Sequence, residues 1–562
     1  MKIKKSVIIF DFIIIPLLIF LFSFNPFFAH GPLVSIDEGQ HLSWINAIFH
    51  GQIPYRDTYL IYGSIYELIP AAIMCVVGKS IAVLRALHHF GMIFWLIIAY
   101  LFGRLILKRR LFAYLLAWLL IATRVVPFWS SRWGGLRNGI PFLTIVFLSL
   151  FTKKKRFFWL YLAGLCNGVS LLYTQEAGIA MLLASGVFIL AFKWFEASNR
   201  KKSFFKLGAI YLGGIMSIIL PIFLYLGINN ALGTYLKICF IDIPFKFPKY
   251  FVDVYPYMGL LPKTNILKTL SNPPLAKAFL FCVAFAGYII SFVYIAYWAI
   301  RKKESKEDMD TSLEMVNILT LSIFGFFLLI FAIRQIHGMQ FNIAVPPLLI
   351  IGCVLWEKLF SYLCKVCQEK NISAYKRTIA FITNVSIILL MSVFIYHFTK
   401  PLPQFRYLYD NIFGYSSSRQ AIKEKFQMLT LDRSNGIMVP KKQAEELEFV
   451  VNYIKNNTAP DDPIFVFPHN AEYYFLSDRV CASRFTLATF AVISPDYEDE
   501  VIEDLKRKKP EYVIYVKDAY VLTHFHPVAS EERIPKIFNY IKRNYLPVER
   551  TYDTYILKRN GS

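Results

Sequence analysis

The segment SIDEGQHLSWINAIFHGQIPYRD, residues 35–57, follows directly on the first apolar stretch of the chain, which runs from Val7 to about Phe24. If that stretch crosses a bilayer, the adjacent carboxylates Asp37 and Glu38 lie within a few residues of a membrane surface. The stretch follows MKIKK, but it lacks the small-residue cleavage site that a secretory signal peptide requires. We therefore expect a retained first membrane helix followed by an acidic loop.

The rest of the chain has the composition of a membrane protein. Of its 562 residues, 56% are hydrophobic and only 18% are charged, whereas a typical soluble domain has about 25% charged residues. The net charge of +23 would suggest a nucleic-acid partner in a soluble chain, but here much of the Lys and Arg forms short clusters between apolar segments. The sequence therefore predicts a polytopic α-helical membrane protein without a nucleic-acid partner.

The positive clusters predict how the chain threads the membrane, because short cytoplasmic loops are enriched in Lys and Arg. The clusters lie at residues 2–5, 104–110, 153–156, 200–206, 301–306 and 365–377. If all of them are cytoplasmic, an even number of crossings separates each adjacent pair. The apolar runs then give about eleven transmembrane helices, near 6–24, 82–103, 111–129, 138–152, 157–174, 177–195, 207–227, 276–299, 315–333, 341–362 and 378–398.

The short apolar stretch 63–78 would break this even count if it crossed the membrane. It contains Gly63, Glu67 and Pro70, so we expect it to dip into the outer face without crossing. Residues 1–399 then form a transmembrane domain with a cytoplasmic N-terminus and with outer loops at 25–81 and 228–275. Everything after residue 400 lies on the outer side.

Residues 400–562 have a different pattern and are predicted to form an extracytoplasmic α/β domain. DPIFVFP and PEYVIYV are typical of buried strands, and TYDTYILKR is typical of a closing strand. Helical patterns near 443–457, 498–508 and 534–544 alternate with them. The domain carries no Gly-rich phosphate loop, nucleophile elbow or metal motif, which favours a role as a lid or scaffold.

The acidic segment by itself allows two interpretations. Ser35 with Glu38, or Asp37 with Gln40, would form a capping box at the start of a helix, and carboxylates are favoured there by the helix dipole. Alternatively, the two carboxylates belong to a functional site. Apolar residues at helical spacing after them suit a helix that lies on a membrane: Leu42, Ile45, Ile48 and Phe49.

The other outward turns also carry polar and charged residues, which are costly beside hydrocarbon unless they line a site. Carboxylates in one loop with arginines in others would suit proton abstraction from an acceptor and binding of a phosphate leaving group. For each arginine, the alternative is an interface anchor whose side chain reaches toward water. The candidate binding residues are Arg56, Asp57, Tyr62, Arg137, Glu176, Arg334 and His337.

An Asp-Glu pair soon after the first helix, then an amphipathic helix and a G-x-x-P-Y-x-D turn at residues 51–57, resembles the GT-C superfamily of membrane glycosyltransferases. The protein O-mannosyltransferases and the lipid A aminoarabinose transferases are the most similar types. The resemblance covers most of the membrane part and extends to the large outer loop and the outward C-terminal domain. It implies a catalytic transmembrane domain over residues 1–399.

The resemblance implies transfer of a hexosyl or pentosyl group, with inversion, from a polyisoprenyl-phosphate donor to a protein, lipid or glycan acceptor on the extracytoplasmic face. Asp37 matches the catalytic base of the family, and Glu38 matches the adjacent supporting acid. Arg137 falls where relatives carry an Arg followed by an acid, but Asn138 occupies the acidic position here. That departure puts a second carboxylate in this loop, and a metal-binding pair with it, in doubt.

The resemblance also places Arg334 and His337 near the donor phosphate, and Arg56, Asp57 and Tyr62 fit the wall of the same cavity. No cofactor is predicted, although some GT-C enzymes use a divalent cation. The expected setting is a bacterial or archaeal plasma membrane, with membrane lipids as further partners. Two alternatives stay open: a transporter or flippase of lipid-linked sugars, and a non-catalytic protein of cell-envelope glycan assembly.

Overall fold

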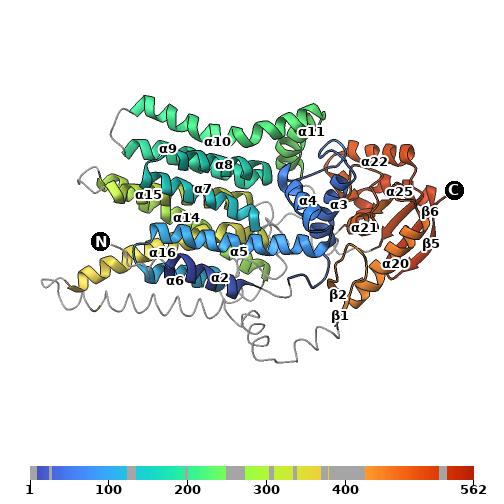
Figure 1. Cartoon of the computed structure of the whole chain (residues 1–562), viewed down its shortest axis with the longest axis horizontal. Coiled ribbons are helices and arrows are strands. Elements are labelled where there is room, and N and C mark those ends of the chain that lie inside the picture. The colour runs from blue at the N-terminus through green and yellow to red at the C-terminus, as the bar shows by residue number, and fades with distance from the viewer. Residues whose placement is uncertain are drawn as a thin grey trace.

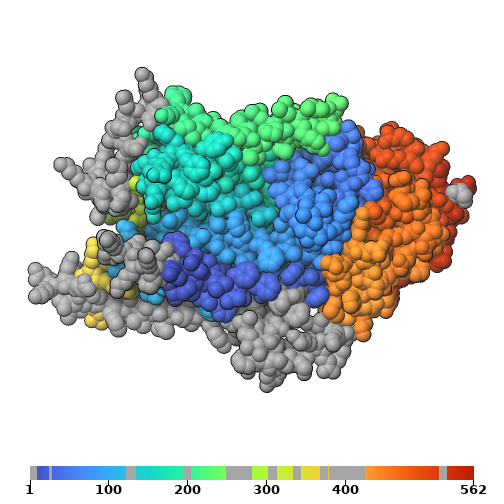
Figure 2. Space-filling model, in the orientation of Figure 1, coloured from blue at the N-terminus to red at the C-terminus, as the bar shows by residue number. Residues whose placement is uncertain are grey.

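The computed structural model describes residues 9–24, 28–122, 135–195, 200–247, 273–302, 309–332, 338–368, 378, 425–517 and 528–561. Of the described residues, 74% are helical. A bundle of long helices meets a smaller α/β domain at one end (Figure 1). On the face seen in Figure 2, the blue N-terminal segments pack directly against the orange α/β domain. The predicted polytopic helical fold with a C-terminal α/β domain is thus confirmed.

Within the described residues, seven helices are long and apolar enough to cross a membrane. Each coincides with one of the spans predicted from the sequence. They are α5 (Ile81–Ile106), α7 (Gly135–Lys154), α9 (Gln175–Phe195), α10 (Arg200–Ile228), α14 (Pro273–Lys302), α15 (Met309–Ala332) and α16 (Gly338–Gln368).

Shorter apolar helices complete the described part of the bundle. These are α2 (Ile15–Ser23) after the π-helical turn η1 (Phe10–Ile14), α4 (Ile65–Val77), α6 (Arg110–Ala122) and α8 (Phe157–Tyr173). Helix α4, with 13 residues, is about 20 Å long and too short to cross a hydrocarbon core of about 30 Å by itself. Its length agrees with the expectation that 63–78 does not cross. The predicted span 378–398 lies outside the described residues, apart from Thr378.

Helix α5 separates the basic loops from the α/β domain. Its first residue donates a backbone hydrogen bond of 2.9 Å from Ile81 N to Arg433 O in that domain. Its last turn carries Arg104, which binds the buried Asp11 of η1 with 2.9 Å between Nε and Oδ2. Because α5 has 26 residues and rises about 1.5 Å per residue, the cluster 104–110 and the α/β domain lie at opposite ends of the bundle. The predicted topology, in which an even number of crossings separates the positive clusters and the α/β domain lies on the other side, requires this arrangement.

Glycines allow α8 and α10 to pack closely. A Cβ at Gly164 would lie 2.1 Å from the carbonyl oxygen of Tyr211, and one at Gly214 would lie 2.3 Å from that of Tyr161. Small residues at such crossings let membrane helices approach and strengthen their van der Waals contact. Asn167 Nδ2 also donates a hydrogen bond of 2.9 Å to the Tyr211 hydroxyl. The contact fixes α8, whose last residue, Tyr173, borders the candidate site.

The α/β domain contains a four-stranded sheet of order β3-β4-β6-β5, in which only the β3–β4 pair is parallel. The three predicted helices and the first two of the three predicted strands are present: β3 (Phe465–Phe467), β4 (Tyr512–Val516), α20 (Lys441–Asn457), α22 (Pro495–Lys508) and α25 (Pro535–Asn544). The closing strand predicted in TYDTYILKR is β6 (Thr554–Arg559), which begins after Tyr552, at φ 49°, turns the chain back from β5 (Tyr545–Thr551). The sequence did not predict the hairpin β1 (Phe426–Met428) with β2 (Met438–Pro440), nor the short helices α21 (Glu472–Ser477), η7 (Ala488–Ile493) and α24 (Ser530–Arg533).

The described part of the outer loop 228–275 docks on the α/β domain. It forms α11 (Leu232–Lys237) and the π-helical η4 (Ile238–Lys246). The Tyr497 hydroxyl donates a hydrogen bond of 2.5 Å to Asp242 Oδ2, and Lys237 Nζ lies 3.2 Å from the same hydroxyl. Helix α22, which carries Tyr497, is therefore tied to the outer loop.

The capping-box alternative for the acidic segment and the expectation of a helix on the membrane are both wrong. The segment forms a π-helical turn η2 (Ser35–Gly39) that continues into α3 (Gln40–Phe49), and neither start has a side-chain cap. The reason is that Ser35 and Glu38 bind partners distant in sequence instead of the local backbone. Helix α3 also does not lie on a membrane, because Leu42 and Ile45 are fully buried and the helix packs between α4 and the α/β domain (Figure 1).

Candidate active site

Glu38 forms a buried ion pair, whereas the neighbouring Asp37 does not form one among the described residues. Arg85 donates two hydrogen bonds to Glu38, at 2.5 Å to Oε1 and 2.8 Å to Oε2. The same guanidinium donates to the carbonyl oxygens of Ala29 at 2.5 Å and Gly31 at 3.3 Å. The pair thus fixes the chain that leads into the acidic segment, and it suits Glu38 to a supporting role.

Asp37 is half-buried, and no hydrogen bond to its side chain is found among the described residues. Burial raises the pKa of Asp37 to about 6, the positive charge of His41 opposes that rise, and the charge of Glu38 adds to it. A carboxylate of that pKa is ionised at neutral pH, yet it accepts a proton more readily than an ordinary Asp. Asp37 therefore has the properties of a general base.

His41 lies one helical turn after Asp37 and binds Glu67 of α4. Its Nδ1 atom forms a hydrogen bond with Glu67 Oε1, and both side chains are almost completely buried. The rings of Tyr66 and Tyr62 stack on the imidazole with centroids 4.9 Å and 5.7 Å away. The aromatic contacts continue from Tyr66 to Tyr173 at the end of α8, at 4.5 Å.

Arg137 and Glu176 form a second ion pair, between the starts of α7 and α9. Arg137 Nη2 donates a hydrogen bond of 2.5 Å to Glu176 Oε1. Arg137 is 2% exposed and Glu176 is 20% exposed, so the pair opens to the surface through the carboxylate. The guanidinium carbon of Arg137 also lies 5.9 Å from the centre of the Tyr62 ring.

Tyr62 therefore joins the two groups, because it contacts His41 on one side and Arg137 on the other. We call the joined set the junction cluster. It brings together the predicted site residues Asp37, Glu38, Tyr62, Arg137 and Glu176 with His41, Glu67, Tyr66 and Tyr173. The last four were not among the predicted site residues, although Glu67 is a carboxylate in an apolar stretch and His41 follows Asp37 by four residues.

Arg56 and Asp57 lie apart from these contacts, in a turn of the outer loop. Arg56 donates hydrogen bonds of 2.9 Å and 2.8 Å to the two carboxylate oxygens of Asp57, and 47% of the arginine side chain is exposed. Asp57 Oδ2 also accepts a hydrogen bond of 2.8 Å from the backbone N–H of Ile53. These contacts stabilise the turn itself. Arg334 and His337 lie outside the described residues.

Asn138, which occupies the position where the resemblance implies an acidic residue, faces the protein interior. Asn138 is 8% exposed, and its Oδ1 atom has no hydrogen-bond partner among the described residues. Across the described ranges, no group of three or more His, Cys, Asp or Glu side chains could hold a metal ion.

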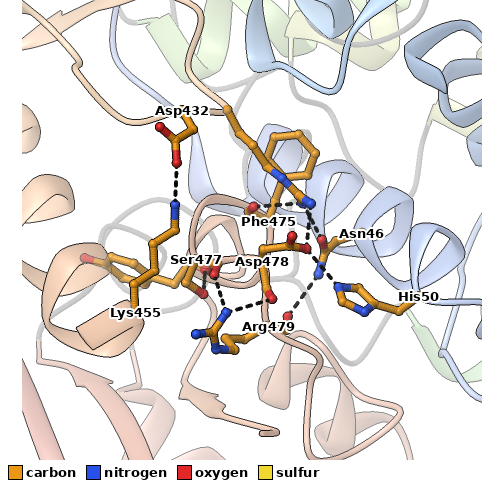
Figure 3. A network of polar contacts seen from close by, with 10 residues as sticks. Asn46, His50, Asp432, Lys455, Phe475, Ser477, Asp478 and Arg479 are labelled. Atoms are coloured by element: carbon orange, nitrogen blue, oxygen red, sulfur yellow. Dashed lines mark hydrogen bonds and ion pairs between the residues drawn. The ribbon is translucent and has the colours of Figure 1, made fainter. Parts of the chain in front are cut away.

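The α/β domain holds the far end of α3. Asn46 Nδ2 donates a hydrogen bond of 2.9 Å to the carbonyl oxygen of Arg479, and Arg433 Nη1 donates one of 2.7 Å to Asn46 Oδ1. His50 Nε2 lies 2.9 Å from Asp478 Oδ1, so the last turn of the helix faces a polar network of the domain (Figure 3). The helix that follows Asp37 is therefore fixed over its whole length by protein contacts.

Comparison with known proteins gives matches in structure only. No protein-family model and no curated protein sequence matches the chain. The crystal structure of ArnT from Cupriavidus metallidurans bound to undecaprenyl phosphate is 14% identical, with a TM-score of 0.51 over 100% of this chain and 99% of that one. The apo ArnT structure is 13% identical, with a TM-score of 0.53 over 97% of this chain and 96% of ArnT. The present chain therefore shares the fold of ArnT over nearly its whole length.

Proposed function

We propose that this integral membrane protein is a glycosyltransferase that moves a hexosyl or pentosyl group from a polyisoprenyl-phosphate donor to a protein, lipid or glycan acceptor. The observation that carries the proposal is the junction cluster, in which Asp37 and Arg137 are connected through His41 and Tyr62. A base and a cation at one end of a GT-C fold suit deprotonation of the acceptor hydroxyl and stabilisation of the departing phosphate. The binding of undecaprenyl phosphate by ArnT supports a lipid-phosphate donor.

In the proposed reaction, Asp37 removes the proton from the acceptor hydroxyl as its oxygen attacks the anomeric carbon. The bond between that carbon and the phosphate oxygen breaks on the opposite face, so the configuration inverts and the electron pair leaves with the phosphate. The proton remains on Asp37 until it passes to water. The products are the glycosylated acceptor and the polyisoprenyl phosphate.

Arg137 of the junction cluster is proposed to bind the departing phosphate, because guanidinium groups bind phosphate through paired N–H donors. Glu176 holds one edge of this guanidinium and so directs the remaining donors. Glu38 supports Asp37 through its pair with Arg85, and Tyr62 provides an aromatic wall between base and cation. Arg334 and His337 are proposed as further donor-phosphate residues on the resemblance alone.

In the proposed topology, the N-terminus lies in the cytoplasm and the α/β domain lies outside, in a bacterial or archaeal plasma membrane. It includes no resident metal ion. The α/β domain acts as a scaffold, because its described contacts with the site run through α3 and η2 rather than through a reacting group.

The test is a donor screen on the purified full chain in lipid nanodiscs. Undecaprenyl-phosphate-linked mannose, glucose, aminoarabinose and a furanose are each supplied with cell-envelope extract as the acceptor source, and release of undecaprenyl phosphate is measured. We expect release from at least one donor and its loss in Asp37→Asn. Asp432→Asn is the matched control, because the same substitution then removes a carboxylate that is 86% exposed.

Release at the wild-type rate in Asp37→Asn would show that Asp37 is not the base. If no donor is consumed but a labelled lipid-linked sugar moves from one leaflet to the other in vesicles that contain the protein, the chain is a transporter. Neither activity, with retained glycan binding, would favour a non-catalytic assembly protein.

A further inference from the structure

The His41–Glu67 pair is a buried acid–base pair whose cost in stability calls for an explanation. Glu67 is 0% exposed, and its Oε2 atom has no hydrogen-bond partner among the described residues. A carboxylate in such surroundings is stabilised chiefly by the imidazole bound to its other oxygen. Apolar side chains of similar volume would stabilise the same packing as well or better, so the pair has little value as a purely structural contact.

The position of His41 relates the pair to the proposed base. Asp37 and His41 are separated by four residues where η2 continues into α3, and this spacing places the two side chains on one face of a helix. Glu67 binds the imidazole at Nδ1 and thereby fixes the orientation of the ring. Trp44 and Tyr66 restrict it further, with ring centroids 5.8 Å and 4.9 Å from that of His41.

We infer, on the basis of the proposed function, that His41 and Glu67 are positioning residues for the base Asp37. Glu67 holds the imidazole of His41 in a fixed orientation one turn after Asp37, and the charge of this imidazole favours the ionised form of the half-buried carboxylate. The pair makes no bond to the substrate. It sets the lower limit of the pH range in which Asp37 can accept the proton of the acceptor.

The charged and titratable groups around His41 are consistent with this role. Helix α4 presents Glu67 and Tyr66, the outer loop presents Tyr62, and α5 presents His88, with its ring centroid 5.9 Å away. Glu38 next to Asp37 is paired with Arg85. Of these groups, the His41 charge is the one that lowers the pKa of Asp37 against the effect of burial.

The test measures the pH dependence of kcat with whichever undecaprenyl-phosphate-linked sugar is active in the donor screen. For the wild type, kcat should fall on the acid side of the pH profile with a midpoint near pH 6, because burial raises the pKa of Asp37 to about 6. We call this fall the acid limb. His41→Gln keeps an amide that can bind Glu67 but removes the charge, so the limb should move up by about one pH unit. Glu67→Gln removes the anion that supports the charge and should move the limb in the same direction by a smaller amount.

A structural role alone would lower kcat or the melting temperature without moving this limb. Trp44→Phe is the matched control for packing, because it changes an uncharged ring that contacts His41 and should leave the limb in place. Infrared difference spectra between the wild type and Asp37→Asn follow the protonated carboxyl of Asp37 without any donor. When the same spectra are recorded for proteins that also carry His41→Gln, the Asp37 carboxyl should show a higher titration midpoint.

An unchanged acid limb and an unchanged infrared midpoint in His41→Gln would overturn the inference, whereas the proposed function would stand as long as Asp37→Asn is inactive. Conversely, full activity of Asp37→Asn would overturn the assignment of Asp37 as the base, on which this inference rests. A rise in the infrared midpoint in His41→Gln would then still show that His41 controls the ionisation of Asp37.

Discussion

The hydroxyl of Ser35 donates a hydrogen bond of 2.6 Å to Oε1 of Glu472, which lies 437 residues further along the chain. Asn470 Nδ2 contacts the same serine oxygen at 3.2 Å. Leu33 and Gln443 exchange two further hydrogen bonds of 2.9 Å just before the acidic segment. The α/β domain is thereby bonded to the chain immediately before Asp37, as well as to the end of α3.

The backbone at Gly39 lies close to Glu472 of the α/β domain. A Cβ atom there would lie 2.5 Å from Glu472 Oε2 and 3.0 Å from the Glu472 backbone nitrogen. Gly39→Ala should therefore displace α21 or the turn that carries Asp37, lowering the melting temperature and reducing kcat by about tenfold, which corresponds to roughly 1.4 kcal/mol. Scanning fluorimetry and sugar transfer would measure the two effects.

Gly186→Ala is the control for this substitution, because Gly186 lies in α9 and a Cβ there meets nothing within 4 Å. Alanine at such a helical position should preserve stability or raise it slightly. Wild-type activity and stability of Gly39→Ala would contradict the close approach.

The ionisation of Glu472 should make stability depend on pH. Burial raises the pKa of Glu472 from 4.5 to about 7, although hydrogen bonds from Ser35, its own backbone and Asn470 oppose the rise. A raised pKa means that the folded state favours the protonated acid, so this contribution is full below pH 4.5 and is lost as the pH rises through about 7. At pH 8, Glu472→Gln should therefore be more stable than the wild type by on the order of 1–3 kcal/mol.

Thermal unfolding of both proteins between pH 4 and pH 8.5 would check this prediction. The two melting temperatures should converge at the acid end of the series, because the wild-type carboxyl is then protonated like the amide. A constant difference across the series would show that Glu472 does not titrate in this range.

Asp37→Asn should separate catalysis from stability. Loss of the proposed base should reduce transfer by about 10²–10⁴-fold. Burial raises the pKa of Asp37 from 3.8 to about 6, so ionisation of the wild-type carboxyl reduces folding stability as the pH rises through that value. The variant should accordingly melt at a higher temperature than the wild type at pH 8 and at the same temperature near pH 3.5. An inactive variant that also melts lower at pH 8 would indicate a structural rather than a catalytic defect.

Substitutions at Arg137 and Glu176 should affect the donor more than the acceptor. Arg137→Lys keeps the charge but loses the forked geometry that binds Glu176 and phosphate together, so we expect a fall of about 10- to 100-fold in kcat/KM for the lipid donor. Glu176→Gln should give a smaller loss, because the guanidinium remains but is less strongly directed. Steady-state kinetics with each substrate varied in turn would distinguish the two. An effect confined to the acceptor KM would contradict the assignment of Arg137 to the phosphate.

The sequence by itself determined the elements of this protein. Apolar runs of membrane-spanning length predicted α5, α7, α9 and the later long helices, because transfer into hydrocarbon depends on local composition. Strand and helix patterns likewise predicted β3, β4, α20, α22 and α25. The sequence also singled out Asp37, Tyr62 and Arg137 as polar residues that a membrane surface would not otherwise retain.

Only the tertiary structure decided what these residues contact. The apolar stripe of α3 is equally suited to a membrane surface and to a protein interior, and the contact with the α/β domain selects the interior. Ser35 and Glu38 have the pattern of a capping box, yet they bind Glu472 and Arg85, which are brought close only by folding. Hydrophobic periodicity reflects interactions within a few residues of sequence, whereas the pairing of His41 with Glu67 and the bridging position of Tyr62 depend on how distant segments pack.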